Sequence, residues 1–273
     1  MIDLASLWDF SNPQLSEQRF RQALEQATSD DALLLQTQIA RTYGLRKDFA
    51  KAQEILATLT DSIATASPEV QVRYFLELGR TFASSTHPSE LQSPENKAQA
   101  TKHNLHAFEI AKAAQLDYLA VDALHMMAFV ETEPSVQLDW NLKALAYMEA
   151  SPQEEVKKWE ASLRNNVGYA QHLLGHYDDA IQQFQLSLAA HQRAGNVQNV
   201  RIASWMIAWT LRIQGKLPEA LEIQLRLEQE WAADGEPDPY VFEELEQLYR
   251  ALGDTEQADR CAEKLRLTKS AHA

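Results

Sequence analysis

Histidines and a single cysteine are the residues whose types and spacing could support chemistry in this sequence. His103 and His106 are three residues apart and His172 and His176 are four apart, so each pair could offer two nitrogens to one ion. A stable zinc site needs three or four ligands, and neither pair has a third. Cys261 has no basic partner that the sequence assigns to it. We interpret these histidines as surface residues and Cys261 as a buried structural thiol, and we predict no metal and no cofactor.

Motifs of the large enzyme classes are absent from the sequence, which has no Walker loop, GxGxxG, HExxH or GxSxG. A catalytic interpretation would have to rest on a constellation such as His125, His172 and nearby carboxylates. Such groups need an enclosed pocket and perturbed environments, which nothing in the pattern implies. We therefore predict that the chain is not an enzyme; stoichiometric metal in the purified protein would contradict this.

The charge balance narrows the class of partner. The 273 residues include 25 Lys and Arg against 39 Asp and Glu, for a net charge of −14. Such a chain repels phosphate backbones, so we expect no nucleic acid as a partner, and the charge weakly favours a basic one. One cysteine cannot form an internal disulfide. The N-terminus carries Asp3 early and lacks a basic leader, and no stretch has the apolarity of a membrane span, so we expect a cytoplasmic protein.

Helical periodicity runs through almost the whole chain. Leu33, Ile39, Ala40 and Tyr43 fall on one stripe at helical spacing, and alternating strand patterns are missing. With 8 glycines and 9 prolines, turn-forming residues are scarce, which favours helices with short connections. Three Ser-Pro pairs predict helix starts, because the hydroxyl can cap a free N–H and proline has none to lose: Ser67-Pro68, Ser93-Pro94 and Ser151-Pro152.

Internal repetition is the strongest signal. Three stretches share a glycine, an anchor residue two positions later and an alanine three positions after that: Gly175–Ala180, Gly215–Ala220 and Gly253–Ala258. An earlier copy, Lys47–Ala52, matches without the glycine. An apolar helix is predicted upstream of each copy, at Leu33–Leu45, Ser162–Leu174, Ile202–Gln214 and Tyr240–Leu252.

This pattern resembles the tetratricopeptide repeat (TPR), in which a small residue lets two helices of a pair cross closely and an alanine follows in the second helix. The resemblance covers about residues 30–266 and implies an all-α fold, a right-handed α-α superhelix of about six antiparallel helix pairs. The second-helix alanines would be Ala52, Ala180, Ala220 and Ala258. The small crossing residues would be Ala40, Gly79, Ala128, Gly168 and Ala208.

Two features depart from the repeat pattern. The third pair has Trp140 where an alanine is expected, and the second pair is interrupted by Ser84–Asn96. This insertion is either an idle surface loop or a flap over the groove. As domain organisation we expect capping helices over residues 1–28, the solenoid over 29–267 and a disordered tail over 268–273, in one domain.

The resemblance implies that the first helix of each pair lines a concave groove. The groove positions would lie one residue off the core stripe, and they collect asparagine, aromatic and arginine side chains. Asparagine can bracket an extended backbone, aromatics supply stiff contact area, and arginine can pair with carboxylates. The predicted binding residues are Arg73, Glu77, Arg80, His125, Phe129, Asn165, Asn166, Tyr169, His172, Trp205, Trp209 and Arg212.

These observations predict a protein- or peptide-binding scaffold that uses the concave face. In an alternative interpretation the two tryptophans only pack against the next pair. A second alternative is a self-assembling structural or regulatory module, such as a homodimer, and a peptide-sensing regulator is a special case of the first interpretation. A late acidic run between Glu228 and Glu246 is either a solvated stretch or a docking edge for a basic partner.

Overall fold

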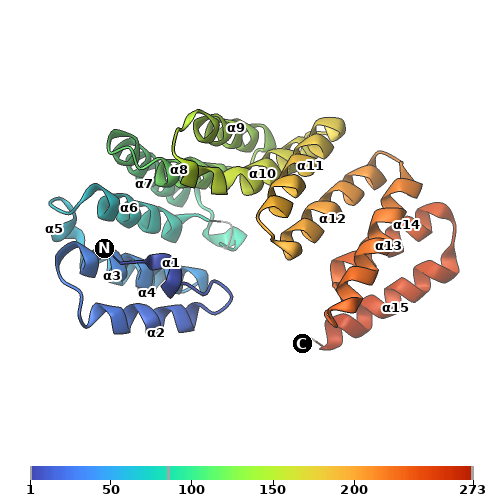
Figure 1. The fold of residues 1–273 in the computed structure, drawn as a ribbon, viewed down its shortest axis with the longest axis horizontal. Helices are drawn as coiled ribbons and strands as arrows, with labels where there is room; N and C mark the ends of the chain where they lie inside the picture. The colour runs from blue at the N-terminus through green and yellow to red at the C-terminus, as the bar shows by residue number, and fades with distance from the viewer. Residues whose placement is uncertain (1, 85–86, 272–273) are drawn as a thin grey trace. The chain divides into compact units, whose positions relative to one another are not determined.

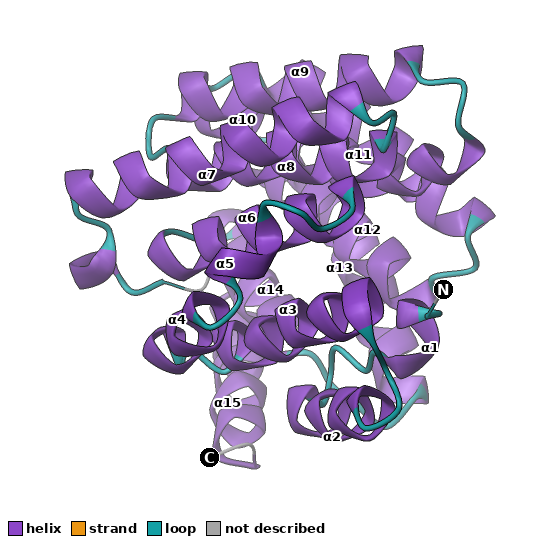
Figure 2. Ribbon diagram, turned by 90° about the vertical axis from the view of Figure 1, so that its left-hand side faces the viewer, coloured by secondary structure: helices purple, strands orange, loops and turns teal. Residues whose placement is uncertain are grey.

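The computed structural model describes residues 2–84 and 87–271. Within them the chain consists of helices joined by short loops, with no strand (Figure 2). The chain divides into two compact units, Met1–Trp159 and Glu160–Ala273, which we call unit 1 and unit 2. Among the described residues, none of the helices combines the length and the apolarity that crossing a bilayer requires.

Unit 1 begins with two helices that cover the first repeat and continues through three helix pairs (Figure 1). Each first helix packs on its own second helix and on the first helix of the next pair, because α3 contacts α4 and α6, and α6 contacts α7 and α8. The α-helices are α1 (Leu4–Leu7), α2 (Pro13–Leu24), α3 (Ser29–Leu45), α4 (Phe49–Ala57), α5 (Thr60–Ile63), α6 (Pro68–Phe82), α7 (Pro94–Ala113), α8 (Asp117–Val130) and α9 (Pro134–Ala150), with 3-10 turns η1 (Ser89–Leu91) and η2 (Glu154–Trp159).

Unit 2 repeats the same plan with three more pairs. Its helices are α10 (Glu160–Leu173), α11 (Tyr177–Arg193), α12 (Val197–Ile213), α13 (Leu217–Ala233), α14 (Pro239–Leu252) and α15 (Thr255–Ala271). The four apolar helices predicted upstream of the repeated motif are α3, α10, α12 and α14. The predicted tail is helical as far as Ala271, and Thr268 donates a hydrogen bond to the Lys264 carbonyl; residues 272 and 273 lie outside the described part.

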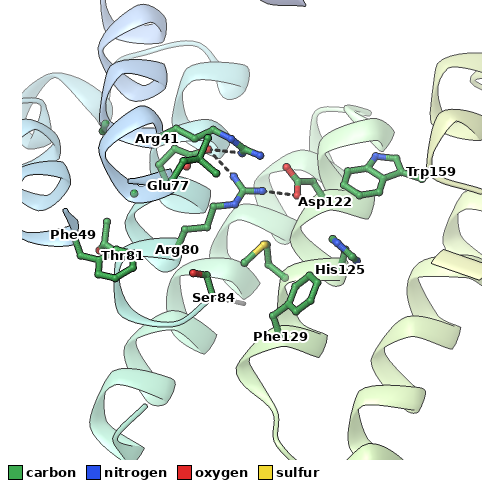
Figure 3. A pocket seen from close by; sticks show the side chains of 14 residues that line it. Arg41, Phe49, Glu77, Arg80, Thr81, Ser84, Asp122, His125, Phe129 and Trp159 are labelled. Carbon is green, nitrogen blue, oxygen red and sulfur yellow. Dashed lines mark hydrogen bonds and ion pairs between the residues drawn. The ribbon is translucent and has the colours of Figure 1, made fainter. Parts of the chain in front are cut away.

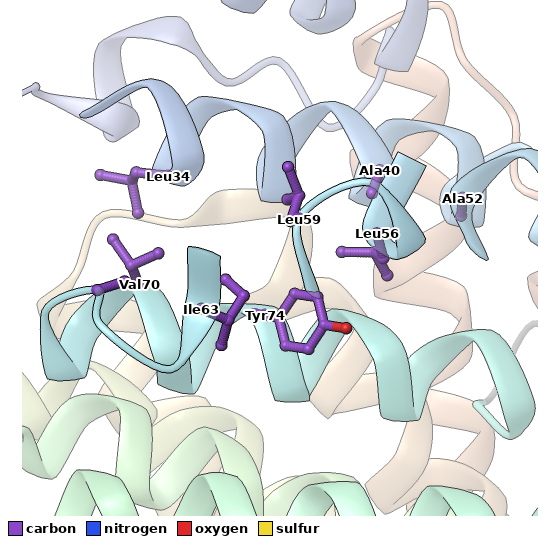
Figure 4. Close-up of a cluster of buried hydrophobic side chains, with 9 residues drawn as sticks. Leu34, Ala40, Ala52, Leu56, Leu59, Ile63, Val70 and Tyr74 are labelled. Atoms are coloured by element: carbon purple, nitrogen blue, oxygen red, sulfur yellow. The ribbon is translucent and has the colours of Figure 1, made fainter. Parts of the chain in front are cut away.

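The core lies between the two helices of each pair and between neighbouring pairs. In unit 1, Leu34 and Ala40 of α3 meet Leu56 of α4 and Val70 and Tyr74 of α6 (Figure 4). At the open end of this stack, Phe20 of α2 is fully buried against Leu35 and Ile39, with Leu4, Leu7, Trp8 and Leu24 packed around it. The N-terminal helices therefore cover apolar surface that the first pair would otherwise expose.

The small residues of the repeat do allow close approach. A Cβ on Gly168 would lie 2.8 Å from the Phe184 ring and 3.1 Å from the Ala180 carbonyl oxygen, so only glycine fits between α10 and α11. Ala40, Ala128 and Ala208 are likewise buried at their positions. The alanine of the repeat sits on the partner helix at each crossing because a larger side chain would push the two backbones apart.

The structure corrects the register of the third pair. The buried row of α9 runs through Asn141, Ala144 and Met148, so Trp140 lies beside that row rather than on it. Its indole is partly exposed, with the Lys143 ammonium 4.1 Å from the ring centroid. The Ser-Pro starts also differ, because Pro68 and Pro94 open α-helices while Ser151 precedes the 3-10 turn η2.

Candidate functional site

Unit 1 contains a cavity of about 290 Å³ bordered by the first helices of its three pairs (Figure 3). Arg41 enters from α3, Arg80 from α6 and His125 from α8, while Trp159 of η2 closes one side. Each of these helices contributes the face adjacent to its buried stripe, as the repeat register predicts. The cavity is therefore built from the elements that the resemblance assigns to ligand binding.

Four charged side chains form one network at this cavity. Arg80 donates to the Glu77 carboxylate at 2.6 Å and to the Asp122 carboxylate at 2.5 Å, and Arg41 donates to Glu77 at 2.9 Å. Burial opposes the charge of Arg80, but Asp122 and Glu77 raise the pKa of its guanidinium overall. Burial likewise opposes the charge of Asp122, and Arg80 and Arg41 hold the pKa of that carboxyl below its usual range. Two cations thus balance two anions within the protein.

His125 is the neutral member of the cavity wall. Its ring lies 4.7 Å from the Phe129 ring and 5.1 Å from the Trp159 ring, between centroids. Burial lowers the pKa of the imidazole to about 4, against the effect of Asp122, which raises it. The side chain therefore acts as an aromatic surface near neutral pH, and the exposed Phe129 extends that surface toward solvent.

The insertion Ser84–Asn96 borders the same cavity at its first residue. His87 is buried, stacks on Phe49 with 3.7 Å between ring centroids, and has Nε2 3.1 Å from the Thr81 carbonyl. Its Nδ1 lies 2.8 Å from the Ser84 hydroxyl. Because Ser84, Thr81 and Phe49 all line the cavity, the contacts of His87 attach the described start of the insertion to the cavity wall.

Unit 2 presents an aromatic row in place of the charged network. The Trp209 ring stacks on His172 with 3.4 Å between centroids and lies 6.2 Å from Tyr169 and 5.8 Å from Trp205. Trp205 in turn lies 6.5 Å from Tyr240. We call these five residues, from α10, α12 and α14, the aromatic row. Trp205 and Trp209 also pack against the core, so the packing alternative holds for part of each side chain.

His172 connects the aromatic row to the core, because it stacks on Trp209 and lies within hydrogen-bond distance of the buried Thr210. The imidazole is buried, so the interpretation of His172 as a surface residue is wrong. Its Nδ1 lies 2.9 Å from the Thr210 hydroxyl, and burial together with Arg212 lowers its pKa to about 4. Tyr169 is 44% exposed, so its ring remains available to a ligand. Asn165 and Asn166 lie half-buried on the same helix, α10.

The three arginines expected to meet ligand carboxylates already have partners within the protein. Arg73 pairs with Glu69 at 3.0 Å, and Arg80 belongs to the charged network. Arg212 makes two hydrogen bonds to the Glu244 carboxylate, at 2.7 and 2.8 Å. A ligand carboxylate would have to compete with these pairs. The arginines therefore hold neighbouring side chains of the protein in place.

Sequence reasoning missed Arg41, Trp159 and Tyr240. A signal existed for Arg41, because it directly follows the small crossing residue Ala40. Arg80, Phe129, Tyr169 and Trp209 hold that same position in later pairs. Trp159 lies in a 3-10 turn outside the repeat, so no periodic signal marks it.

No group of three or more histidine, cysteine or carboxylate side chains is arranged to hold a metal ion in the part of the chain that the structure describes. His103 and His106 instead contact the Phe75 ring, at 6.1 and 4.3 Å between centroids. Cys261 is buried in the core of unit 2, and burial raises the pKa of its thiol. The predicted burial of the Cys261 thiol is therefore confirmed.

Comparison with known proteins supports the fold. No protein-family model matches the sequence, and no curated protein matches it. Among solved structures, the chain is similar to a signal transduction ATPase with a tetratricopeptide repeat sensor from Pyrococcus horikoshii, with 12% identity and a TM-score of 0.71 over 95% of this chain and 39% of that one. The chain thus spans about two fifths of the Pyrococcus protein.

Two further structures are similar over most of their length. NprR in complex with its cognate peptide NprX shares 14% identity with a TM-score of 0.55, over 96% of this chain and 76% of that one. Aspartyl phosphate phosphatase F from Bacillus subtilis shares 13% identity with a TM-score of 0.62, over 95% and 67%. These likenesses confirm the all-α architecture that the repeats predicted: the chain has a tetratricopeptide-like helical-repeat fold.

Proposed function

We propose that the chain is a non-catalytic receptor for a polypeptide segment, which it binds on the faces of its first helices. The observation that carries this proposal is the unit 1 cavity, whose walls come from α3, α6 and α8 in succession. A ligand that crosses several helices touches one or two side chains on each, which suits an extended peptide better than a compact metabolite.

The chemistry of both units supports a binding role. Phe129 in unit 1 and Tyr169 in unit 2 are large aromatics that remain 36% and 44% exposed beside rings that are fixed in place. Partly exposed aromatics on a rigid surface are frequent anchors in peptide recognition. NprR, one of the similar structures, was solved with a peptide bound. A peptide-sensing regulator is the form of the proposal that this likeness favours.

The ionisable groups of the cavity support a non-catalytic role. Arg80 and Asp122 hold each other in their charged forms, and burial lowers the pKa of His125 to about 4, so none of these three groups is poised to exchange a proton near pH 7. One similar structure is named as an aspartyl phosphate phosphatase, so phosphatase activity is the enzymatic alternative to exclude. An assay with acetyl phosphate as substrate checks it, and we expect no release of phosphate above background.

Selection from a random-peptide library on the immobilised full chain tests the binding function. We expect enriched peptides whose binding falls about tenfold or more in Phe129→Ala or Tyr169→Ala, because each removes an exposed anchor. The control is Trp140→Ala, which removes a partly exposed aromatic from a second helix. Circular dichroism should show the same helix content in all three variants. The proposal fails if no peptide is enriched, or if Trp140→Ala weakens binding as much as the other two.

A further inference from the structure

Unit 2 has a hollow of its own, a groove of about 440 Å³ whose walls include Trp205 and Tyr240 of the aromatic row. Its walls come from the first half of α12, the end of α13 and the start of α14. Ile202, Trp205 and Met206 form one side, and Trp231, Tyr240 and Val241 form the other. Ile202 is 44% exposed and Tyr240 is 65% exposed, so two large apolar side chains of the groove face solvent. We call this hollow the α12–α14 groove.

The walls of this groove are held in place by polar contacts. The Trp205 indole donates from Nε1 to the Tyr240 carbonyl at 3.1 Å, which joins α12 to α14. The Arg201 guanidinium lies 4.6 Å from the Trp231 ring centroid and pairs with Asp234 at 2.6 Å, which joins α12 to the end of α13. A groove with fixed walls needs little rearrangement when an apolar side chain enters.

An acidic segment, which we call the rim, adjoins the groove and lines it through Asp238. Between α13 and α14 the chain runs Asp234-Gly235-Glu236-Pro237-Asp238, without a lysine or arginine. Gly235 has φ of +75°, a conformation that other residues adopt only with strain, and the Asp238 carboxylate caps α14 by accepting from the Tyr240 N–H at 2.7 Å. The rim is therefore held in a defined shape.

The rim carries more negative charge than the protein balances. Arg201 pairs with Asp234 and approaches Glu230, and Arg226 also approaches Glu230. Glu236 and Asp238 form no ion pair with any residue that the structure describes, and Glu236 is exposed. An apolar floor beside uncompensated carboxylates attracts a ligand that combines an apolar side chain with positive charge.

We propose that the α12–α14 groove binds a peptide segment in which a large apolar side chain is flanked by lysine or arginine. The apolar side chain enters between Ile202 and Tyr240, and the flanking cations meet Glu236 and Asp238. This inference rests on the peptide-binding function proposed above and assigns a ligand chemistry to one part of it. The net charge of −14 acts in the same direction, because it speeds the encounter with a basic ligand.

Fluorescence anisotropy with three labelled peptides and the full chain tests the ligand chemistry. The probe is Lys-Lys-Phe-Leu-Lys-Lys, and the two comparison peptides are Glu-Glu-Phe-Leu-Glu-Glu and Lys-Lys-Ser-Ser-Lys-Lys. We expect the probe to bind at least about tenfold more tightly than either comparison, because each lacks one of the two required features. Equal binding of the acidic peptide or of the serine peptide overturns the proposal.

Variants of the full chain test the location. Ile202→Asp places a carboxylate at the apolar wall, and we expect it to weaken binding of the probe about tenfold or more. The pair Glu236→Gln with Asp238→Asn removes two rim charges while the asparagine keeps the cap, and we expect binding about threefold to tenfold weaker, most clearly at low salt. Glu222→Gln is the control for a charge outside the groove, because it removes an exposed carboxylate of α13 that does not line it.

The outcomes separate this inference from the general one. If the library selection yields peptides but none is both apolar and basic, the peptide-binding function stands and the chemistry assigned to the groove is wrong. If the probe binds and Glu222→Gln weakens it as much as the rim variants, the attraction is a property of the whole acidic surface and the groove assignment is overturned.

Discussion

The two units carry the same repeat plan, but a different kind of contact dominates the equivalent face of each. In unit 1 the face holds ions that satisfy one another, with Arg80 between Glu77 and Asp122. In unit 2 it holds stacked rings, with Trp209 between His172 and Trp205. Removing one member of a balanced ion network leaves a charge without its partner. Removing one ring from a row of rings loses only the contact area of that ring. The face of the first helices is therefore held together mainly by ion pairs in unit 1 and mainly by stacked rings in unit 2.

Breaking the unit 1 network should give the largest effect. Asp122→Ala leaves the part-buried Arg80 with only the Glu77 carboxylate, which it shares with Arg41, and we expect a loss of about 3–5 kcal/mol in the free energy of unfolding, measured in urea. Removing both charges, with Arg80→Leu added, should recover part of this loss. A double variant that is no more stable than Asp122→Ala would show that the charges matter less than the volume they fill. Arg193→Ala, which breaks an exposed pair with Glu160 in unit 2, should cost at most about 1 kcal/mol.

The helix crossings give the next largest effect and also distinguish the units. Gly168→Ala in unit 2 forces a methyl group against Phe184 and the Ala180 carbonyl, at a cost of about 1–3 kcal/mol. Gly79→Ala in unit 1 meets the Asn104 side-chain oxygen at 2.4 Å instead. Because the nearest backbone atom there, the Ala100 carbonyl oxygen, lies at 3.4 Å rather than 3.1 Å, we expect a smaller cost. Thermal unfolding compares the two, and Gly44→Ala, whose methyl group meets nothing within 4 Å, serves as the control.

The pH dependence of stability tests the buried imidazole of unit 2. His172 titrates near pH 6.5 when unfolded and near 4 in the fold. Above pH 6.5 both states are neutral; below it the unfolded chain takes up a proton that the fold does not, so stability falls as the pH falls toward 4. One such group contributes at most about 1.4 kcal/mol per pH unit.

His172→Phe keeps an aromatic ring stacked on Trp209. Between about pH 6.5 and pH 5, we expect this variant to have a slope of unfolding free energy against pH that is smaller than in the wild type by up to about 1.4 kcal/mol per pH unit. Urea unfolding across that window measures the slope. His125→Phe in unit 1 should act the same way, because its pKa is also about 4. An unchanged slope in both variants would mean that the imidazoles reach solvent in the fold.

The smallest effect concerns a single hydrogen bond of the aromatic row. Trp205→Phe retains most of the ring contact but loses the donor to the Tyr240 carbonyl, and we expect a cost of about 0.5–1.5 kcal/mol. Hydrogen exchange should show faster opening at the start of α14 than elsewhere in unit 2. Trp140→Phe is the reference, and a cost as large as that of Trp205→Phe would indicate a general loss of ring area.

Repeat spacing predicted most of the fold because each repeat is a local unit. Two helices that cross closely need small residues at the crossing, as α10 and α11 have in Gly168 and Ala180. Such a crossing can therefore be recognised from the sequence alone. Trp140 misled the register of the third pair because it lies as far after Ala128 as Ala180 lies after Gly168, whereas the buried row of α9 runs through Asn141, Ala144 and Met148. The same local logic selected Arg80, Tyr169 and Trp209 as surface positions next to a crossing.

What the sequence could not determine is which charged groups find one another. Arg41, Glu77, Arg80 and Asp122 come from three helices, and their pairing depends on how α3, α6 and α8 stack. The sequence by itself determined the helices, the crossings and the off-stripe positions, because these follow from periodicity and side-chain size. Only the tertiary structure decided that arginines expected to face a ligand are satisfied internally, and that an acidic segment adjoins an apolar groove, because electrostatic pairing and cavities depend on distances between elements far apart in the chain.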